Sequence, residues 1–424
     1  MTDSKFNSIL KRGIAEIINE AELMKLLESG RILNLKQGFD PSAPDIHLGH
    51  VVGLRKLRQF QELGHKVTLI VGDWTARIGD PSGQSTTRPI LSQDQIQNNA
   101  QTYLEQFFKV VDKDRTEIRW QSEWYNKFTL DEIIRLSSKF TVAQLLARED
   151  FNKRYSSGNP ISLAEMLYPL LQAYDSVVIQ ADVEFGGIDQ KFNCLLGREL
   201  QKIMGQPPQQ VFLVPLLIGT DGNQKMSKSL GNYIGIKEPP QEVYGKVMSI
   251  PDSLIIDYFE LVTDAPDKEI AEIKEQMNNG SINPMSIKKR LAHEIVKQFN
   301  DEESASEAEQ YFSKVFQKKE TPQEIAEHLF PSRYIGDALY EIDIAPTLIK
   351  EGIVRSKGEL KRLLSQKAIE LNGDKINDSI INARHGSILR IGKRNFVRIA
   401  VTPLCHPERS EGSKEIGDSS RSLP

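Results

Sequence analysis

The stretch KVTLIVGD (Lys66–Asp73) decides the fold class. Its apolar residues run together and end at a glycine and an aspartate, which predicts a short buried strand. The stretch VFLVPLLIG (Val211–Gly219) predicts a second strand of this kind. Between them apolar residues recur at the helical intervals of three and four, in LDEIIRLSSKFTVAQLLARE, LAEMLYPLLQAYDSVVI and QKFNCLLGRELQKIMG. Such alternation from Arg31 to about residue 220 predicts an α/β domain, a parallel sheet wrapped by helices.

The rest of the chain predicts a helical domain, a small mixed domain and a tail. From about residue 240 to 330 the sequence is charged and has helical spacing, with short Pro, Gly or Asp breaks. After a linker that follows ETPQEIAEHLFPSR, a short basic helix precedes a hairpin, where Asn372-Gly373 favours a tight primed turn. The polar tail PLCHPERSEGSKEIGDSSRSLP lacks periodicity and predicts disorder. The boundaries that we expect are 1–220 (α/β), 221–335 (all-α), 338–402 (α+β) and 403–424 (tail).

Composition excludes several classes of protein. The 424 residues exceed what one hydrophobic core usually supports, and the hydrophobic (39%) and charged (26%) fractions are those of a globular protein. No apolar run approaches the roughly 20 residues that span a bilayer, and the N-terminus lacks an export signal. We therefore expect a cytoplasmic location and no membrane partner. Two cysteines, Cys194 and Cys405, are too few for a disulfide framework or a cysteine-based zinc site.

Charge is distributed unevenly along the chain. Residues 345–400 hold twelve Lys or Arg and five Asp or Glu, a local net charge of +7 in a chain of −4. The remaining residues therefore sum to −11. A basic terminal module on an acidic body suggests that this module meets a polyanion.

Two histidines stand three residues apart in DIHLGH (Asp45–His50). A helix that starts just after Pro44 places His47 and His50 in its first turn, where unbonded N–H groups and the helix dipole attract anions. Gly49 lacks a Cβ, so a flat ligand can lie against the backbone there. The histidines alone fit a metal pair, a phosphate grip or an ordinary helix surface. Zinc would need one or two further ligands, and no histidine or cysteine stands nearby in sequence, so we assign no metal site.

The stretch DGNQKMSKSLGN (Asp221–Asn232) favours the phosphate interpretation. Lys225 and Lys228 lie three residues apart, serines flank the second lysine, and glycines stand near both ends. These features predict a mobile loop that closes over a polyphosphate and offers positive charge to it. A lysine pair alone is usually a solvated surface feature. Both motifs in one chain, each after a predicted strand, make that interpretation weaker.

The motifs HLGH and KMSKS together resemble the signature pair of class I aminoacyl-tRNA synthetases. The segments between them are similar to those of bacterial-type tyrosyl-tRNA synthetases of the KMSKS subgroup: GFDPSAPDIHLGH (Gly38–His50), IGDPSG (Ile78–Gly83), LLQAYDSV (Leu170–Val177) and FGGIDQKFN (Phe185–Asn193). The basic C-terminal module resembles their S4-type RNA-binding domain. The resemblance covers about residues 5–400. It implies a Rossmann-like catalytic domain, a helical anticodon-side domain that follows the KMSKS loop, and an S4-like domain.

The resemblance implies a tyrosine–tRNA ligase. Such an enzyme forms tyrosyl-adenylate and pyrophosphate from tyrosine and ATP, then transfers tyrosine to the 3′-terminal adenosine of tRNA(Tyr). The carboxylate nucleophile is already ionised at neutral pH, so catalysis reduces to positioning and charge stabilisation. The resemblance also implies Mg²⁺ with the ATP, and a homodimer. Its ATP-binding residues correspond to His47, His50, Lys225 and Lys228 as the catalytic phosphate contacts, Gly49 against adenine, Gly187 and Asp189 at the ribose, and Met226, Ser227 and Ser229 in the loop.

The resemblance implies an amino-acid pocket as well. Its members are Asp80, Tyr168 and Gln172 around the α-ammonium, Asp175 at the phenolic hydroxyl, and Asp40 and Gln190 near the reacting carboxylate and ammonium. Independently of the resemblance, Tyr168, Gln172 and Asp175 fall at i, i+4 and i+7, on one face of one helix. A core tyrosine and an acid paired with an arginine would give the same pattern.

Three positions depart from the best-known family pattern. Lys36 stands where many members have a tyrosine that donates to the phenolic oxygen, so Lys36 is the candidate donor here. Gln37 and Gly53 stand where other members have residues that contact the ribose, and we assign them no role.

The basic module supplies the candidate tRNA contacts, which are Arg355, Lys357, Lys361, Arg362, Arg390, Lys393 and Arg394. Lysine and arginine suit phosphate contacts, although a solvated basic face has the same composition. Two rival functions stay open. Activation of tryptophan on the same fold is disfavoured by Asp175 and by the basic module. A catalytically inactive synthetase-like RNA-binding protein is disfavoured by the intact HLGH and KMSKS motifs and Asp80.

Overall fold

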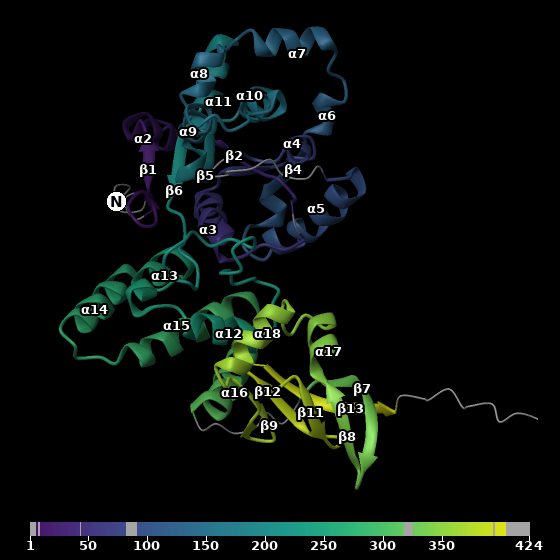
Figure 1. The fold of residues 1–424 in the computed structure, drawn as a ribbon. Helices are drawn as coiled ribbons and strands as arrows, with labels where there is room; N and C mark the ends of the chain where they lie inside the picture. Colours follow the sequence, from purple (N-terminus) through teal and green to yellow (C-terminus); the bar gives the residue numbers. More distant parts are fainter. Residues whose placement is uncertain are drawn as a thin grey trace, which may run out of the picture. The chain divides into compact units, whose positions relative to one another are not determined.

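The computed structural model describes Phe6 and residues 9–42, 44–81, 91–317, 325–392 and 395–403 (Figure 1). The chain divides into two compact units, Met1–Phe312 and Ser313–Pro424. The predicted disordered tail lies outside the described residues from position 404 onward. No helix within the described ranges is long and apolar enough to cross a membrane.

The first unit contains a six-stranded sheet in the order β1-β6-β5-β2-β3-β4. The five strands from β2 to β6 are parallel to their neighbours, and only the short β1 pairs antiparallel, with β6. The strands are β1 (Glu16–Ile18), β2 (Asn34–Phe39), β3 (Lys66–Val71), β4 (Thr116–Trp120), β5 (Val183–Gly187) and β6 (Gln210–Val214). The sheet confirms the expected Rossmann-like α/β class, and β3 and β6 are the two strands that the apolar runs predict.

Helices cover both faces of this sheet, with α3 and α5 on one side and α10 and α11 on the other (Figure 1). The predicted helical stretch from residue 130 to 149 forms two helices, because Thr129 and Thr141 each cap a new helical start. The helices are α2 (Glu20–Glu28), α3 (Leu48–Glu62), α4 (Thr75–Ile78), α5 (Gln93–Phe107), α6 (Ser122–Tyr125), α7 (Leu130–Ser137), α8 (Val142–Leu146), α9 (Glu149–Ser156), α10 (Leu163–Ile179) and α11 (Lys191–Ile203).

The strand order creates a crevice at the centre of the sheet. From β2 the chain proceeds outward to β3 and β4, whereas β5 and β6 lie on the other side of β2. Connections therefore leave the carboxyl ends of β2 and β5 in opposite directions. In open α/β sheets, ligands bind at such a switch point.

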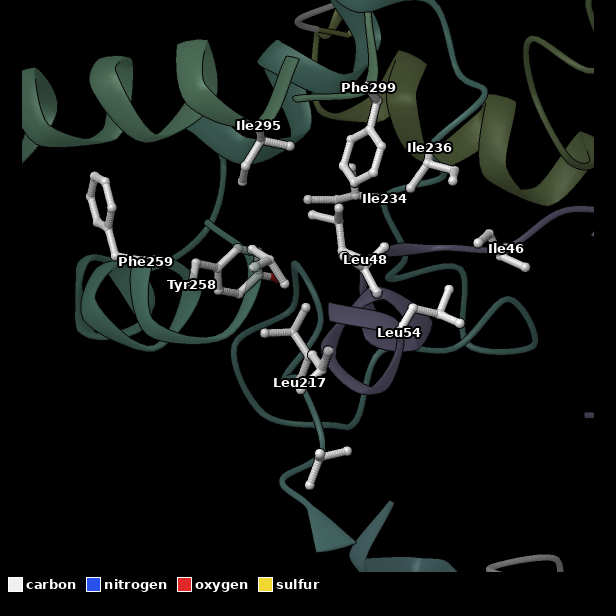
Figure 2. Packing of buried hydrophobic residues seen from close by; sticks show 14 of the residues in the cluster. Ile46, Leu48, Leu54, Leu217, Ile234, Ile236, Tyr258, Phe259, Ile295 and Phe299 are labelled. Atoms are coloured by element: carbon white, nitrogen blue, oxygen red, sulfur yellow. The ribbon is translucent and has the colours of Figure 1, made fainter. Parts of the chain in front are cut away.

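The helical part of the first unit shares one hydrophobic core with the sheet. Figure 2 shows Leu48 and Leu54 of α3 packed beside Ile234, Tyr258 and other side chains of the helical part. Tyr258 also donates a hydrogen bond of 2.7 Å to the Ile218 carbonyl. This packing ties the α3 segment to both flanks of the KMSKS loop. The helices are α12 (Pro240–Met248), α13 (Ile255–Val262), α14 (Asp267–Asn278), α15 (Pro284–Phe299) and α16 (Glu302–Phe312).

Within its described residues, the second unit contains a seven-stranded sheet, in the strand order β10-β9-β12-β13-β7-β8-β11, the α-helices α17 and α18, and a short π-helix (Ser313–Gln317). Asn372 and Gly373 have φ angles of 50° and 95°, which confirms the primed turn between β9 and β10. The elements are β7 (Glu327–Gly336), β8 (Leu339–Asp343), α17 (Ile344–Lys350), α18 (Lys357–Ser365), β9 (Ile369–Leu371), β10 (Asp374–Lys375), β11 (Ile380–Ala383), β12 (Ile388–Ile391) and β13 (Asn395–Pro403).

The expected linker after Arg333 is instead part of a hairpin. The strand β7 continues to Gly336, and a two-residue turn with φ angles of 49° at Asp337 and 58° at Ala338 leads into β8. Phe330 and Ser332 alternate inward along β7, which gives the strand its buried face. Strand β7 therefore belongs to the C-terminal sheet although its residues precede position 338.

Candidate active site

A cavity of about 360 Å³ opens where β2 and β5 end. The structure gathers around it most residues that the sequence predicts to bind ATP or tyrosine. Those that line it are Asp40, His47, Gly49, His50, Asp80, Tyr168, Gln172, Asp175, Gly187, Asp189, Gln190, Lys225, Met226 and Ser227. The other predicted ligand contacts, Lys36, Lys228 and Ser229, lie outside this lining, whereas Gln37 and Gly53, which received no role, belong to it.

The two histidines form the N-terminal cap of α3. The Gly49 N–H donates to His47 Nδ1 over 3.2 Å, and the His47 N–H donates to His50 Nδ1 over 3.3 Å. A ring nitrogen that accepts a hydrogen bond carries no hydrogen, so each neutral imidazole holds its hydrogen on Nε2. The cap therefore fixes both tautomers and leaves two Nε2–H donors.

Both imidazoles are neutral at physiological pH. Burial lowers the pKa of His50 to about 4, and the nearby Lys228 charge acts in the same direction. Burial also holds the pKa of His47 well below its usual value, with His50 and Lys228 as further causes. The pair thus offers hydrogen bonds to an anion without adding a formal charge.

This assignment predicts an NMR result. In long-range ¹H–¹⁵N spectra of the protein without ligand, His47 and His50 show the neutral Nε2–H pattern at pH 6.5, because both pKa values lie below that usual value. Titration of either histidine at or above pH 6.5 would contradict the buried cap.

The KMSKS loop is organised around one buried asparagine, Asn232. Its Oδ1 accepts from the Ser227 N–H over 2.8 Å, and its Nδ2 donates to Asp221 Oδ2 over 3.0 Å and to the Lys225 carbonyl over 3.1 Å. A Cβ on Gly219 would lie 2.3 Å from that Nδ2, so the close approach requires glycine. The lysines therefore project from a defined turn.

The loop and the histidine cap meet at one end of the cavity. The Leu48 N–H donates to the Ile234 carbonyl over 3.0 Å, and Met226 is buried with its Cβ 3.7 Å from the position of a Cβ on Gly49. Lys228 influences the pKa of both histidines, which places its charge beside them. Lys225 donates to Asp189 over 3.0 Å, across the mouth of β5. The histidine cap and the loop that carries both lysines thus meet here.

A buried carboxylate forms the opposite end of the cavity. Asp175 of α10 is 2% exposed and accepts from Gln121 Nε2 over 2.8 Å, Trp124 Nε1 over 3.2 Å and the Tyr125 hydroxyl over 3.2 Å. Burial raises the pKa of Asp175 to about 7, with the Lys36 charge opposing the rise. An acid in this environment favours a ligand that brings one more donor.

Hydrogen bonds join this end to the middle of the cavity. Gln121 Oε1 accepts from the Thr75 hydroxyl over 3.0 Å, and that hydroxyl lies 2.6 Å from Asp40 Oδ1. Asp40 Oδ2 accepts from the Tyr168 hydroxyl over 2.9 Å. A Cβ on Gly72 would lie 2.2 Å from Asp40 Oδ1, so glycine leaves room for this carboxylate.

A second carboxylate stands near the middle of the cavity. Asp80 accepts from Gln190 Nε2 over 2.6 Å and pairs with the buried Arg148 at 3.4 Å. Arg148 also donates to Asn193, which in turn donates to Gln190 Oε1 over 3.0 Å. With Asp40 and Tyr168, these groups give the middle of the cavity the acceptors that an ammonium group requires.

Sequence reasoning missed the contribution of β4 and α6. Gln121, Trp124 and Tyr125 hold Asp175, and Arg148 of the segment before α9 holds Asp80. The places of Gln121, Trp124 and Tyr125 in the chain could have identified them, because they follow a parallel strand whose carboxyl end faces the crevice. That strand, TEIRW, has no apolar run by which to recognise it.

The predicted tRNA contacts lie in the second unit. Arg355, Lys357, Lys361 and Arg362 are exposed at and along α18. Arg390 lies 3.4 Å from Glu370 and over the Phe396 ring, 5.6 Å from its centre. Lys393 and Arg394 lie outside the described residues. The basic surface of α18 is therefore the part that faces solvent.

Within the described part of the chain, no three His, Cys, Asp or Glu side chains come together as a metal site. A divalent ion that enters with a nucleotide would take phosphate oxygens and water as its main ligands.

Comparisons with known proteins agree with this geometry. The family model for class I tRNA synthetases (W and Y) matches residues 28–317. The chain is 59% identical to a tyrosine–tRNA ligase of Dehalococcoides mccartyi (strain CBDB1), over 93% of this chain and 98% of that one. It is 49% identical to the corresponding Thermotoga maritima protein, over 94% and 98%. The tyrosyl-tRNA synthetase from Archaeoglobus fulgidus, solved with L-tyrosine, has a similar fold, with a TM-score of 0.58, 23% identity, and coverage of 73% and 100%. The chain belongs to the bacterial-type tyrosyl-tRNA synthetases of class I.

Proposed function

We propose that this protein is a tyrosine–tRNA ligase. It activates L-tyrosine with ATP to tyrosyl-adenylate and pyrophosphate, and then transfers tyrosine to the 3′-terminal adenosine of tRNA(Tyr) in the cytoplasm. One observation carries the proposal: a single cavity is lined by two neutral imidazole donors and Lys225 at one end and by the buried Asp175 at the other. The first end suits a triphosphate, and the second suits a phenol.

In the first reaction the tyrosine carboxylate attacks the α-phosphate of ATP. Because this nucleophile is ionised at neutral pH, the site needs charge stabilisation rather than a general base. The Nε2–H groups of His47 and His50 donate to phosphate oxygens. The KMSKS loop stabilises the negative charge that leaves with pyrophosphate. Its lysines, Lys225 and Lys228, supply the positive charge, and Met226, Ser227 and Ser229 belong to the same ATP-binding loop. Mg²⁺ bound to the ATP supplies further neutralisation.

The adenosine and tyrosine moieties occupy the remaining walls. Adenine lies against Gly49, and the ribose lies at Gly187 and Asp189, where a Cβ on Gly187 would approach Asp189 Oδ1 to 2.6 Å. Asp80, Tyr168 and Gln172 receive the α-ammonium, and Asp40 and Gln190 lie near the reacting groups. Asp175 accepts a hydrogen bond from the phenolic hydroxyl. Three protein donors already favour the charged form of Asp175, and the phenol supplies a fourth donor.

Pyrophosphate exchange tests the first reaction. The assay compares ATP–pyrophosphate exchange dependent on tyrosine, tryptophan and phenylalanine. Exchange with tyrosine alone supports the proposal. Exchange with tryptophan would establish the rival activation reaction, and no exchange with any of the three would favour an inactive RNA-binding protein.

We propose that the chain has a catalytic part (1–220), a helical anticodon-side part (221–312) and an S4-like RNA-binding part, which begins with β7 rather than at residue 338 and runs to residue 402. The exposed cations at and along α18 and three cations further along the chain contact tRNA phosphates. They are Arg355, Lys357, Lys361 and Arg362, and then Arg390, Lys393 and Arg394. Such contacts predict an affinity that falls with salt.

Truncation tests the role of the second unit. A chain that ends at residue 317 lacks the whole C-terminal sheet, including β7. The cut precedes β7 because a cut after this strand would leave it without its partners β8 and β13. We expect tyrosine-dependent exchange within about twofold of the full chain and aminoacylation lowered by about a hundredfold or more, because the phosphate contacts dominate affinity. Aminoacylation that survives truncation would contradict an RNA-binding role.

We also propose a homodimer. Large apolar side chains are exposed on successive helices from α7 to α10, an unusual concentration for a monomer surface. They are Leu130, Ile133, Ile134, Val142, Tyr155 and Leu163. Measurement of the molecular mass in solution, before and after Leu163→Asp, tests whether a second copy covers them.

A further inference from the structure

Lys36 cannot act as the direct donor that the sequence suggests. Its side chain is fully buried beneath the cavity, and its Nζ contacts the Gln172 carbonyl at 2.8 Å, the Ser176 hydroxyl at 2.7 Å and Glu184 Oε1 at 2.9 Å. An ammonium group has three N–H donors. All three have acceptors within the protein, so none is left for a phenolic oxygen.

Glu184 of β5 completes the arrangement. It is 1% exposed and, besides Lys36, accepts from Gln172 Nε2 over 3.2 Å, from the Ser176 hydroxyl over 3.3 Å and from Gln209 Nε2. Lys36 and Glu184 therefore hold α10 at two positions, Gln172 and Ser176, that lie one turn apart. Asp175 stands between these two positions on the same helix.

The helix needs such a hold. Pro169 lies inside α10, where it has no N–H to donate and disturbs the regular backbone bonds. The residues that follow it carry the amino-acid pocket. Side-chain contacts from β2 and β5 thus set where the pocket face of α10 lies relative to the sheet.

We propose that Lys36 and Glu184 form a positioning pair for tyrosine recognition, which fixes Gln172 and Asp175 through α10 without touching the substrate. This inference rests on the proposed activation of tyrosine. It converts Lys36 from a ligand contact into a residue that acts through its neighbours. Because the two charges are buried together, removing either one alone leaves the other uncompensated.

The pair also acts on Asp175 electrostatically. The charged or titratable groups facing Asp175 are Lys36 of β2, Glu184 of β5 and Tyr125 of α6, and burial keeps the Tyr125 pKa well above its usual value. Cys194 of α11 faces Glu184 and has a raised pKa for the same reason, so it stays neutral. Lys36 lowers the pKa of Asp175 and Glu184 raises it. The two members therefore act with opposite sign.

The test uses Lys36→Met, Glu184→Gln and the double variant in tyrosine-dependent pyrophosphate exchange. We expect the KM for tyrosine to rise by about tenfold or more in each, because Gln172 and Asp175 lose the contacts that set their positions, while the KM for ATP stays within about twofold. The pH midpoint of kcat/KM for tyrosine moves up in Lys36→Met and moves down, by less, in Glu184→Gln, because the Lys36 charge has the larger influence on the pKa of Asp175. In the double variant the midpoint lies between those of the two single variants.

Asp182→Asn is the matched control. Asp182 directly precedes β5 and pairs with Arg31 outside the cavity. Asp182→Asn therefore makes the same change of an acid to an amide as Glu184→Gln, at a position outside the amino-acid pocket. We expect unchanged KM values and pH profile for it.

Three results would overturn the inference: an unchanged KM for tyrosine in the double variant, pH shifts of the same sign in the two single variants, or equal rises in the KM for ATP. The double variant leaves no uncompensated buried charge and decides the matter if a single variant does not fold. Wild-type protein without tyrosine-dependent exchange would refute the proposed function instead, so the two failures are distinguishable.

Discussion

Replacing Asp175 by alanine lowers kcat/KM for tyrosine by about a hundredfold or more, because the phenolic hydroxyl loses a charged acceptor in a dry site. The three donors that now hold the carboxylate, Gln121, Trp124 and Tyr125, lose their acceptor at the same time. The KM for ATP changes little, because the phosphate groups bind at the other end of the cavity. Steady-state pyrophosphate exchange with each substrate varied in turn measures both effects.

Phenylalanine supplies the internal control for this variant. In the wild type it leaves Asp175 without the fourth donor, whereas in the variant neither amino acid meets a carboxylate. The ratio of kcat/KM for tyrosine to that for phenylalanine therefore falls toward one. A variant that keeps the wild-type ratio would remove Asp175 from phenol recognition.

The pH dependence of kcat/KM for tyrosine in the wild type provides a second test of Asp175. The carboxylate form of Asp175 accepts the phenol, and burial raises its pKa to about 7. The kcat/KM for tyrosine, which reports the free enzyme, thus falls as the pH drops through about 7 and levels off above it. Asp175→Ala abolishes this step. The comparison isolates one acid from the others that line the cavity.

Most of the fold follows from local patterns in the sequence, whereas most of the candidate site residues follow from the resemblance of several motifs to one family. The apolar runs at Lys66–Val71 and Val211–Val214 predict buried strands, and the spacing of Tyr168, Gln172 and Asp175 puts them on one helical face. The histidine cap is likewise a property of consecutive residues. Local signals of this kind can be recognised in the sequence without knowledge of the tertiary structure.

What the sequence does not provide are the contacts made across the sheet. Lys36 has the right position in the chain to donate to a phenol, yet its partner Glu184 stands about 150 residues away and turns the ammonium inward. Strand β4 lacks an apolar run, so Gln121 and its neighbours carry no signal that they hold Asp175. The strand β7 is hidden in the same way, because its inward alternation is limited to Phe330 and Ser332. Each of these depends on pairing between distant segments.

The KMSKS lysines provide the second large effect. Lys228→Met lowers kcat of pyrophosphate exchange by about a hundredfold to a thousandfold, because one preorganised charge that meets the leaving phosphates is gone. Lys225→Met has a similar effect and in addition removes the ion-pair partner of Asp189, the proposed ribose contact, so its KM for ATP changes as well. The KM for tyrosine stays near the wild-type value in both.

Lys237→Met is the matched control for the loop variants. Lys237 lies a few residues beyond the loop, is 39% exposed and pairs with Glu105 outside the cavity, so its loss should leave kcat within about twofold. The Lys228→Met variant also tests whether Lys228 acts beside the histidine cap. Its charge lowers the pKa of His47 and His50, so in Lys228→Met both imidazoles titrate at a higher pH, which the same ¹⁵N spectra detect. A large loss of kcat without that shift would mean that Lys228 acts away from the histidine cap, and the loop and the cap would then not serve one triphosphate.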